Sequence, residues 1–101
     1  SAFRKVVLIE FPRRGLLAIG FVTGESRGEV QEFTRENMLN VFVPTMPNPT
    51  SGFLIFSPLE ELTEVSMTIE EGIKYVVSGG LVTPPVLKII EAKGLKIEQP
   101  S

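Results

Sequence analysis

The chain has 101 residues, a length that can bury one hydrophobic core but not two, so we predict a single domain. Ten Lys and Arg residues against twelve Glu residues give a net charge of -2, which argues against a nucleic-acid-binding protein with a strong basic field. His, Cys, Asp and Trp are absent, which excludes disulfides, thiolate or imidazole zinc sites, catalytic triads and aspartate dyads built from this chain alone.

Hydrophobic residues make up 43% of the chain, and its seven Phe residues exceed what one modest core needs. We therefore expect apolar side chains on the surface, where they would meet a neighbouring subunit, an upstream segment or a bilayer. The apolar runs, such as Val6 to Ile9, fall far short of the ~20 residues that span a bilayer. We expect neither a membrane span nor a signal peptide here, and the early start of the first strand indicates a piece cut from a longer protein.

The first predicted elements form a hairpin. Val6 to Phe11 alternates as a strand. In the turn that follows, Pro12 suits the first central position of a type I turn and Gly15 a closing position with positive φ. The second arm, Leu16 to Thr23, is apolar on both faces, which predicts a central strand with something covering each side.

The middle of the chain predicts further short strands. Gly20 indicates either a bulge or a close backbone approach. Glu29 to Phe33 alternates weakly and is predicted as a short edge strand or an ordered loop. Leu39 to Val43, Phe53 to Phe56 and Leu62 to Met67 are predicted strands, since each is apolar or alternating.

The last third of the chain predicts helices. Thr68 and Glu71 have the spacing of a capping box, so a helix begins there and ends at Gly79-Gly80. A second helix is predicted from Thr83 to about Lys93. The first helix would lay one apolar stripe on the sheet, made of Ile69, Ile73, Val76 and Val77.

These elements predict the α+β class. We expect a mostly antiparallel sheet of five or six strands, flat or curled towards a barrel, with one or two C-terminal helices packed on it. The connections between strands are too short for helical crossovers, which disfavours a parallel sheet. Residues 1–95 are expected to form a single soluble domain, followed by a flexible tail at residues 96–101.

A proline-rich loop from Val43 to Phe53 separates two of the predicted strands. Its three prolines fix φ near -65° and make the loop stiff, while Gly52 is expected to adopt a positive φ in the returning turn. One interpretation is a well-specified hairpin connection. The other is a loop that binds a ligand or a partner through Thr45, Asn48, Thr50, Ser51 and Gly52.

The charged residues offer few candidate sites. Arg13 and Arg14 lie at the predicted hairpin tip, with Arg4 and Lys5 expected nearby, and they are either lipid-facing or part of a solvated turn. Glu70-Glu71 is explained by the helix start, and we predict no catalytic residue, no metal and no cofactor.

The proline-rich loop also carries a family resemblance. The segment P-T-M-P-N-P-T-S-G-F-L-I-F, preceded by F-R-K-V-V-L-I-E-F-P-R and followed by S-G-G-L-V-T-P-P, is similar to the continuous-vascular-ring-like family of membrane proteins, domain of unknown function 502. The resemblance covers roughly Phe3 to Pro85. It implies a parent protein with two transmembrane helices upstream of this region, and it brings no catalytic residues.

We therefore predict a non-enzymatic soluble domain of an integral membrane protein, on the cytoplasmic side. It would mediate self-association as a homo-oligomer, or bind a protein partner, near the bilayer, and it would bind no nucleic acid. A second hypothesis is a domain that senses a small ligand or an anion through the Thr45 to Gly52 loop. An enzyme that uses Glu and Arg is a remote third.

Overall fold

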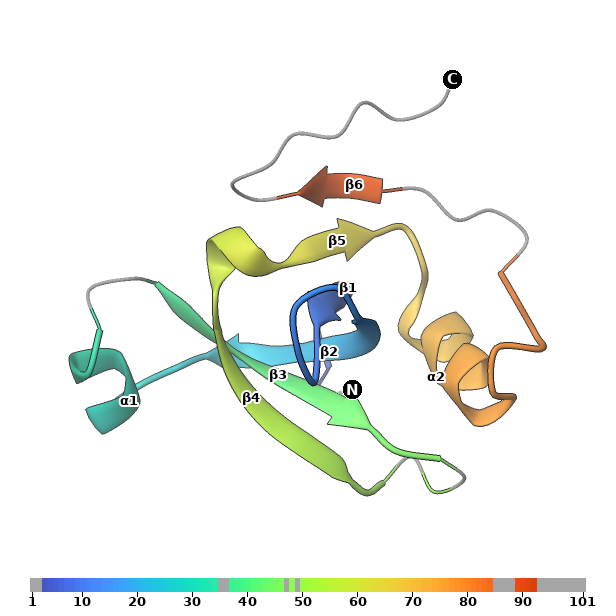
Figure 1. Ribbon diagram of the computed structural model, residues 1–101, viewed down its shortest axis with the longest axis horizontal. Helices are drawn as coiled ribbons and strands as arrows, with labels where there is room; N and C mark the ends of the chain where they lie inside the picture. The colour runs from blue at the N-terminus through green and yellow to red at the C-terminus, as the bar shows by residue number, and fades with distance from the viewer. Residues whose placement is uncertain (1–2, 35–36, 47, 49, 85–88, 93–101) are drawn as a thin grey trace.

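The computed structural model describes residues 3–34, 37–46, 48, 50–84 and 89–92. The elements along the chain are β1 (Lys5–Glu10), β2 (Leu17–Glu25), α1 (Glu29–Glu32), β3 (Met38–Pro44), β4 (Gly52–Pro58), the 3-10 helix η1 (Leu59–Glu61), β5 (Thr63–Val65), α2 (Ile69–Val77) and β6 (Ile89–Ala92). The strands form one sheet in the order β4-β3-β2-β1-β5-β6, and every pairing is antiparallel (Figure 1).

This architecture confirms the predicted α+β class. The sheet is twisted, so β4 crosses the view diagonally while β5 and β6 lie nearly horizontal (Figure 1). Among the described strands the order is linear, with β4 and β6 at the two ends, so the sheet is not closed into a barrel. The chain passes from β4 to β5, on the far side of β1, through the short turn of η1.

The hairpin of β1 and β2 forms as predicted, with a different turn at its tip. The Leu16 N–H donates to the Arg13 carbonyl at 3.2 Å, so Arg14 and Gly15 are the central residues and Pro12 precedes the turn. Gly15 has a φ of 91°, a region that glycine adopts without steric cost, and its N–H donates to the Glu10 carboxylate at 2.7 Å. The positive φ predicted for Gly15 is confirmed, whereas the closing position predicted for Gly15 and the central position predicted for Pro12 are wrong.

The sheet carries an apolar cluster on each face. Because side chains alternate along a strand, consecutive buried residues such as Phe21 and Val22 point to opposite faces of β2. One cluster of buried residues contains Val7, Ile9, Val22, Val41, Val43 and Leu62. The other contains Val6, Phe21, Val65 and Met67. The prediction that β2 is central and covered on both sides is therefore confirmed.

Gly20 leaves room for the side chain of Val41 to lie over β2. A Cβ built on Gly20 would lie 2.5 Å from Val41 Cγ1, and Val41 is fully buried. The β-bulge between β2 and β3 lies elsewhere, between Val22 and Gly24. Neither predicted interpretation of Gly20 is therefore correct, since side chains and not a backbone lie close to it.

Helix α2 begins and ends where the sequence indicates. The Glu71 N–H donates to Thr68 Oγ1 at 3.1 Å, and the Thr68 N–H donates to the Glu71 carboxylate at 3.0 Å, which completes the capping box. Gly79 and Gly80 have φ values of 67° and 89°, and their N–H groups donate to the Val76 and Tyr75 carbonyls. This is the Schellman arrangement that satisfies the last carbonyls of a helix.

The predicted apolar stripe of α2 is only partly correct. Ile69 and Ile73 pack against the cluster that contains Phe21, whereas Val77 is 43% exposed. Gly72 is buried, and a Cβ there would lie 3.0 Å from the Phe21 ring. A residue without a side chain lets the helix lie close to the ring, which an apolar pattern cannot reveal.

The segment Glu29 to Phe33 is not a strand. It contains the single helical turn of α1, in which the N–H groups of Glu32 and Phe33 donate to the carbonyls of Gly28 and Glu29. Phe33 is 94% exposed, so the weak alternation buries no aromatic side chain. Local backbone hydrogen bonds therefore determine this segment.

The second predicted helix, Thr83 to about Lys93, is wrong at its C-terminal part. Ile89–Ala92 forms β6 and pairs antiparallel with β5, with Thr63 opposite Ala92. The pairing satisfies backbone groups along one side of β5, which a helix would leave open. The predicted tail at residues 96–101 lies outside the described residues.

Candidate contact surface

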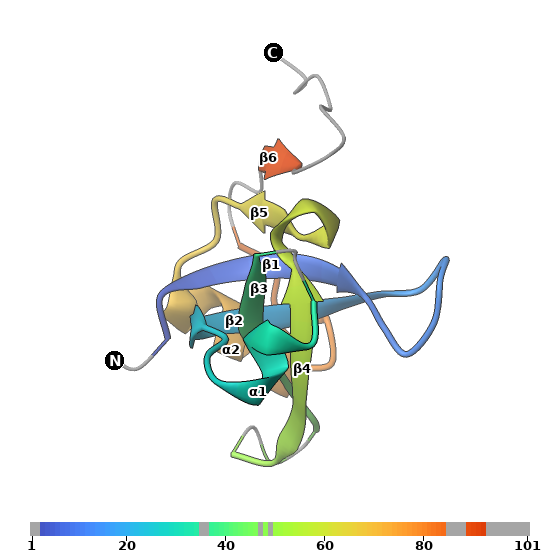
Figure 2. The ribbon, with the colours of Figure 1, turned by 90° about the vertical axis from the view of Figure 1, so that its left-hand side faces the viewer.

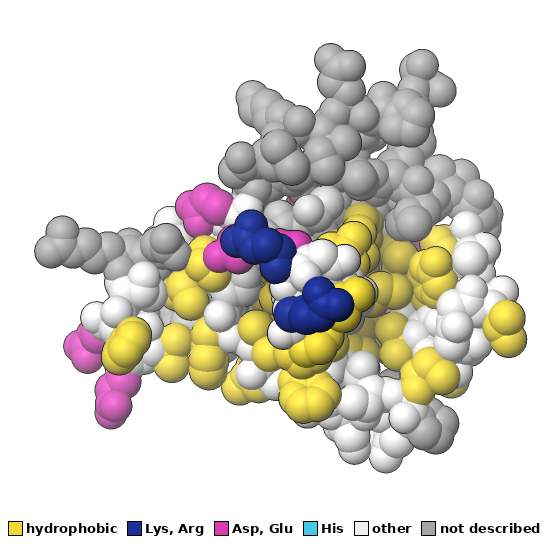
Figure 3. Space-filling model, viewed as in Figure 1, with side chains coloured by type: hydrophobic (Ala, Val, Ile, Leu, Met, Phe, Trp, Pro, Cys, Tyr) yellow, Lys and Arg dark blue, Asp and Glu magenta, His cyan; other side chains and the backbone are white. Residues whose placement is uncertain are grey.

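Strand β4 is an apolar edge strand. Of the elements that the structure describes, β3 is the one with which β4 pairs, and it pairs along its whole length. No charged residue occurs from Gly52 to Pro58. Phe53, Leu54 and Phe56 are 51%, 59% and 41% exposed, and Figure 3 shows how much of one face of the molecule is apolar.

The pairing with β3 determines which backbone groups of β4 point outwards. In an antiparallel pair, residues that exchange hydrogen bonds alternate with residues that do not. Thr45 lies opposite Ser51 in the continued register, and its N–H donates to the Ser51 carbonyl at 2.8 Å. At the other end of the pair, the Leu59 N–H donates to the Asn37 carbonyl at 3.0 Å.

Counting in steps of two from these bonds gives the orientation of each residue of β4. Phe53, Ile55 and Ser57 direct their N–H and C=O groups towards β3. Gly52, Leu54 and Phe56 direct theirs away from the sheet, as does the carbonyl of Pro58. The open edge of β4 therefore presents regularly spaced donors and acceptors.

The exposed side chains of β4 lie on both faces of the sheet. Phe53 contacts Phe11 across one face, with ring centroids 5.2 Å apart. On the other face, Phe56 lines a shallow apolar hollow together with Phe33 and Met38. A partner strand on this edge would therefore find apolar contacts on each side.

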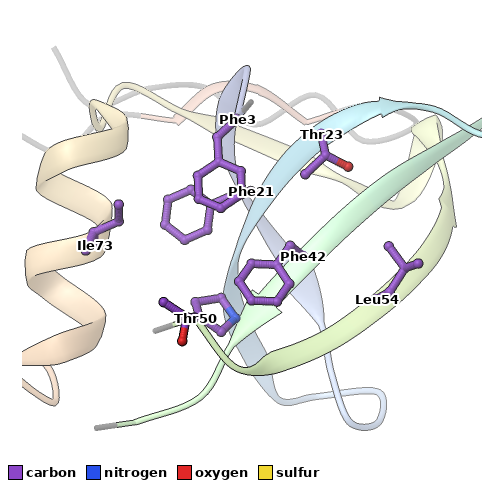
Figure 4. Close-up of a pocket in the computed structure, with 8 residues that line it drawn as sticks. Phe3, Phe21, Thr23, Phe42, Thr50, Leu54 and Ile73 are labelled. Atoms are coloured by element: carbon purple, nitrogen blue, oxygen red, sulfur yellow. The ribbon is translucent and has the colours of Figure 1, made fainter. Parts of the chain in front are cut away.

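A larger apolar hollow lies between α2 and the β3–β4 half of the sheet. It has a volume of about 560 Å³. Its aromatic wall is a stack in which Phe3 lies 5.0 Å from Phe21 and 5.9 Å from Phe42, ring centroid to ring centroid. Ile73 of α2 and Leu54 of β4 lie on opposite sides of it (Figure 4).

This hollow was not predicted, and neither were its Phe residues. Phe3, Phe42 and Ile73 come from distant parts of the sequence, so no local pattern joins them. The one signal in the sequence was the unusual number of Phe residues.

The proline-rich loop is the connection between β3 and β4. Asn48 Oδ1 accepts from the Thr50 N–H at 3.0 Å and from Thr50 Oγ1 at 2.6 Å. Thr45 Oγ1 donates to the Ser51 carbonyl at 3.1 Å. The polar groups of the predicted binding loop are thus close together, and they bond one another.

Gly52 does not have the positive φ that was predicted for it. It lies at the start of β4 opposite Pro44, and a Cβ there would collide with the Val43 carbonyl oxygen and lie 2.8 Å from the Phe42 ring. Steric crowding from β3, and not a left-handed turn, is the reason for glycine at this position.

Arg13 and Arg14 lie at the exposed tip of the β1–β2 hairpin, which projects from the body of the molecule (Figure 2). Arg13 Nη1 donates to the Arg14 carbonyl at 3.1 Å, and Leu17 beside the tip is 65% exposed. Lys5 lies at the opposite end of β1, where it pairs with Glu64 at 3.6 Å. The expectation that Lys5 is near the two arginines is therefore wrong.

The adjacent glutamates at the start of α2 have structural partners. Glu70 pairs with Lys74 at 3.5 Å, and Glu71 completes the capping box. Within the described ranges, no group of three or more acidic side chains is arranged to hold a metal ion.

Comparison with known proteins places this chain in a family. The family model described as "Protein of unknown function (DUF502)" matches residues 1–51. The chain belongs to this family. The resemblance noted from the proline-rich loop is thereby confirmed, and the biochemical function of the family is uncharacterised.

Curated relatives come from Arabidopsis thaliana. The chain is 33% identical to Protein CONTINUOUS VASCULAR RING 1 over 92 residues, which cover 90% of this chain and 33% of the relative. It is 33% identical to Protein LIKE COV 1, covering 90% of this chain and 35% of that relative. Protein LIKE COV 2 is 31% identical over 91 residues, with 90% and 34% covered.

This DUF502 chain spans about a third of the length of these relatives. No solved structure has significant similarity to it. In the part of the chain that the structure describes, no helix is both long enough and apolar enough to cross a membrane.

Proposed function

We propose that this region is a non-enzymatic domain of a membrane protein and that it associates with a second copy of itself through the edge of β4. The observation that carries the proposal is an exposed strand that combines outward backbone groups, apolar side chains and no charge. Such an edge is a template for another strand, and monomeric proteins usually protect their edges with Lys, Pro or a bulge.

Within β4, Pro58 at the C-terminal end is the one residue that gives such protection. Pro58 closes the strand, while Phe53, Leu54, Ile55 and Phe56 lie between it and Gly52 without a bulge in the pairing with β3. Aromatic and β-branched residues are also the types that strands prefer. The strand is thus suited to extend the sheet into a partner.

Replacing Leu54 by lysine should abolish the association. A charge at the centre of the β4 edge would be buried in the paired strands without a partner, whereas in the monomer the side chain is 59% exposed. We expect sedimentation velocity to show a dimer for the wild type and a monomer for Leu54→Lys.

Leu81→Lys is the matched control. Leu81 is 89% exposed and follows α2 in the chain, outside β4, so the same change of side chain should leave the dimer intact. A wild type that stays monomeric at high concentration, or two variants that dissociate equally, would refute the role of β4.

The second part of the proposal places the hairpin tip against the bilayer. Arg13 and Arg14 beside the exposed Leu16 and Leu17 combine positive charge with apolar surface, as membrane-surface segments do. Each basic residue near an anionic surface contributes about 1 kcal/mol.

The double variant Arg13→Gln/Arg14→Gln should bind vesicles that contain phosphatidylserine about 30-fold more weakly than the wild type, from that contribution of about 1 kcal/mol per residue. Arg27→Gln, an exposed arginine next to α1, should bind like the wild type. Co-sedimentation with the vesicles measures both. Equal binding by all three proteins would contradict this orientation.

The hypothesis of an anion sensor has less support. In the Thr45 to Gly52 loop the N–H groups of Thr45, Thr50 and Ser51 already donate within the loop. An anion would have to replace these bonds, so the loop is better suited to holding β3 and β4 in register.

A further inference from the structure

We propose that the second copy pairs antiparallel on β4 with the two-fold axis at Leu54, so that Leu54 lies opposite Leu54 of the other copy. This inference rests on the proposed self-association and names its geometry. A two-fold axis between identical strands requires the same surface on both copies, and β4 presents one.

The first argument is the position of the outward backbone groups. The residues of β4 with both an N–H and a C=O directed away from β3 are Gly52, Leu54 and Phe56. Leu54 is the middle one. An axis there pairs Gly52 of each copy with Phe56 of the other and pairs Leu54 with itself, so each of these donors and acceptors meets a partner.

An axis at Ile55, the midpoint of β4, forms as many backbone hydrogen bonds between the copies but leaves a different carbonyl over. It would place Pro58 opposite Gly52 of the other copy, and proline has no N–H to give to the Gly52 carbonyl. That carbonyl would be left in the interface without a partner, which costs free energy. With the axis at Leu54 the carbonyl left over is that of Pro58, which already accepts from Ser57 Oγ at 3.0 Å in its own subunit, so the backbone favours this axis.

The side chains favour the same register. With the axis at Leu54, the Phe56 ring lies beside Gly52 of the other copy, a position where the crowding from β3 leaves no room for a side chain. On the opposite face Phe53 meets Ile55, and aromatic with β-branched pairs are favourable across strands. With the axis at Ile55, Phe53 would instead meet Ser57, whose side chain is buried in its own subunit.

The pairing also joins the two large hollows. Leu54 lines the hollow between α2 and the sheet, and it lies at the axis. The two copies would form one continuous sheet, and their two hollows would lie side by side on the same face of it. None of the described residues that line the hollow is charged.

Cysteine cross-linking tests the register, because the chain has no cysteine of its own. In the proposed register the two Leu54 Cα atoms are about 5.5 Å apart, a distance that a disulfide spans. The two Ile55 residues are diagonal neighbours at about 7–8 Å, beyond that span. With an axis at Ile55, the two Ile55 Cα atoms would be about 4.5 Å apart, as a pair without hydrogen bonds, and the two Leu54 residues would be the diagonal neighbours.

We expect mild oxidation to convert most of Leu54→Cys into a covalent dimer on a non-reducing gel, with little dimer from Ile55→Cys. Sedimentation of each variant under reducing conditions, with circular dichroism, checks that both fold and associate like the wild type. Leu54 is 59% exposed, so its substitution should not disturb the fold.

The outcomes separate the two proposals. A dimer in solution that cross-links through Ile55→Cys, or through neither cysteine, overturns the register and leaves the self-association standing. A wild-type monomer overturns both. Preferential cross-linking of Leu54→Cys in a wild type that dimerises supports both.

Discussion

Phe21→Ala is expected to lower the free energy of unfolding by about 3–5 kcal/mol, the usual loss when a buried Phe is truncated. Phe21 is the largest fully buried side chain of the protein. Its ring stacks on Phe3 and lies under Gly72 of α2, so the cavity would be left between the sheet and the helix. Rigid backbone on both sides limits how far this cavity can collapse.

The measurement is urea denaturation followed by circular dichroism. Small domains have a stability of about 5–15 kcal/mol, so a loss of this size should lower the midpoint substantially at an unchanged slope. Phe33→Ala is the control, since Phe33 is 94% exposed and should change stability by no more than about 0.5 kcal/mol. Equal effects at Phe21 and Phe33 would show that the ring does not hold α2 on the sheet.

Gly20→Ala is expected to destabilise the domain by about 1–3 kcal/mol, the usual cost of overpacking a core. The new Cβ would lie 2.5 Å from Val41 Cγ1, and Val41 cannot turn away because it is fully buried between strands. Separating β2 from β3 to relieve the contact would weaken the hydrogen bonds that hold β3, and with it β4, to the sheet.

Gly24→Ala in the same strand is the matched control and should have the opposite sign. A Cβ on Gly24 meets nothing within 4 Å, and its φ is not positive. Alanine loses less backbone entropy than glycine on folding, so the variant should gain about 0.5–1 kcal/mol. Thermal denaturation of the pair isolates the steric contribution. Stabilisation by both substitutions would contradict the steric contact between Gly20 and the Val41 side chain.

The candidate surface was predictable only in part. The absence of charge from Gly52 to Pro58 and the surplus of Phe residues were visible in the sequence and indicated exposed apolar surface. The sequence predicted the proline-rich loop as a binding site because its hydroxyl and amide side chains can hydrogen-bond a ligand. In the structure that loop holds its own polar groups, while the strand after it is the exposed element. Its role in ligand binding stays a prediction.

Local patterns by themselves determined the features that depend on neighbours in the chain. The capping box at Thr68 and Glu71, the end of α2 at Gly79-Gly80 and the positive φ of Gly15 were all predicted correctly. Each rests on hydrogen bonds or steric limits that reach only a few residues along the backbone. The alternation of β1 and β2 likewise follows from the two-residue period of a strand.

Only the tertiary structure decided which strand has an open edge and what the buried glycines approach. The order β4-β3-β2-β1-β5-β6 depends on pairings between distant segments, including the one that makes Ile89–Ala92 a strand and not a helix. That order determines which backbone N–H and C=O groups of Leu54 and Phe56 point outwards. It also forms the hollow between α2 and the sheet and creates the need for glycine at Gly20. Contacts between distant residues leave no periodic trace in a sequence, because their energy depends on the partner that folding brings near.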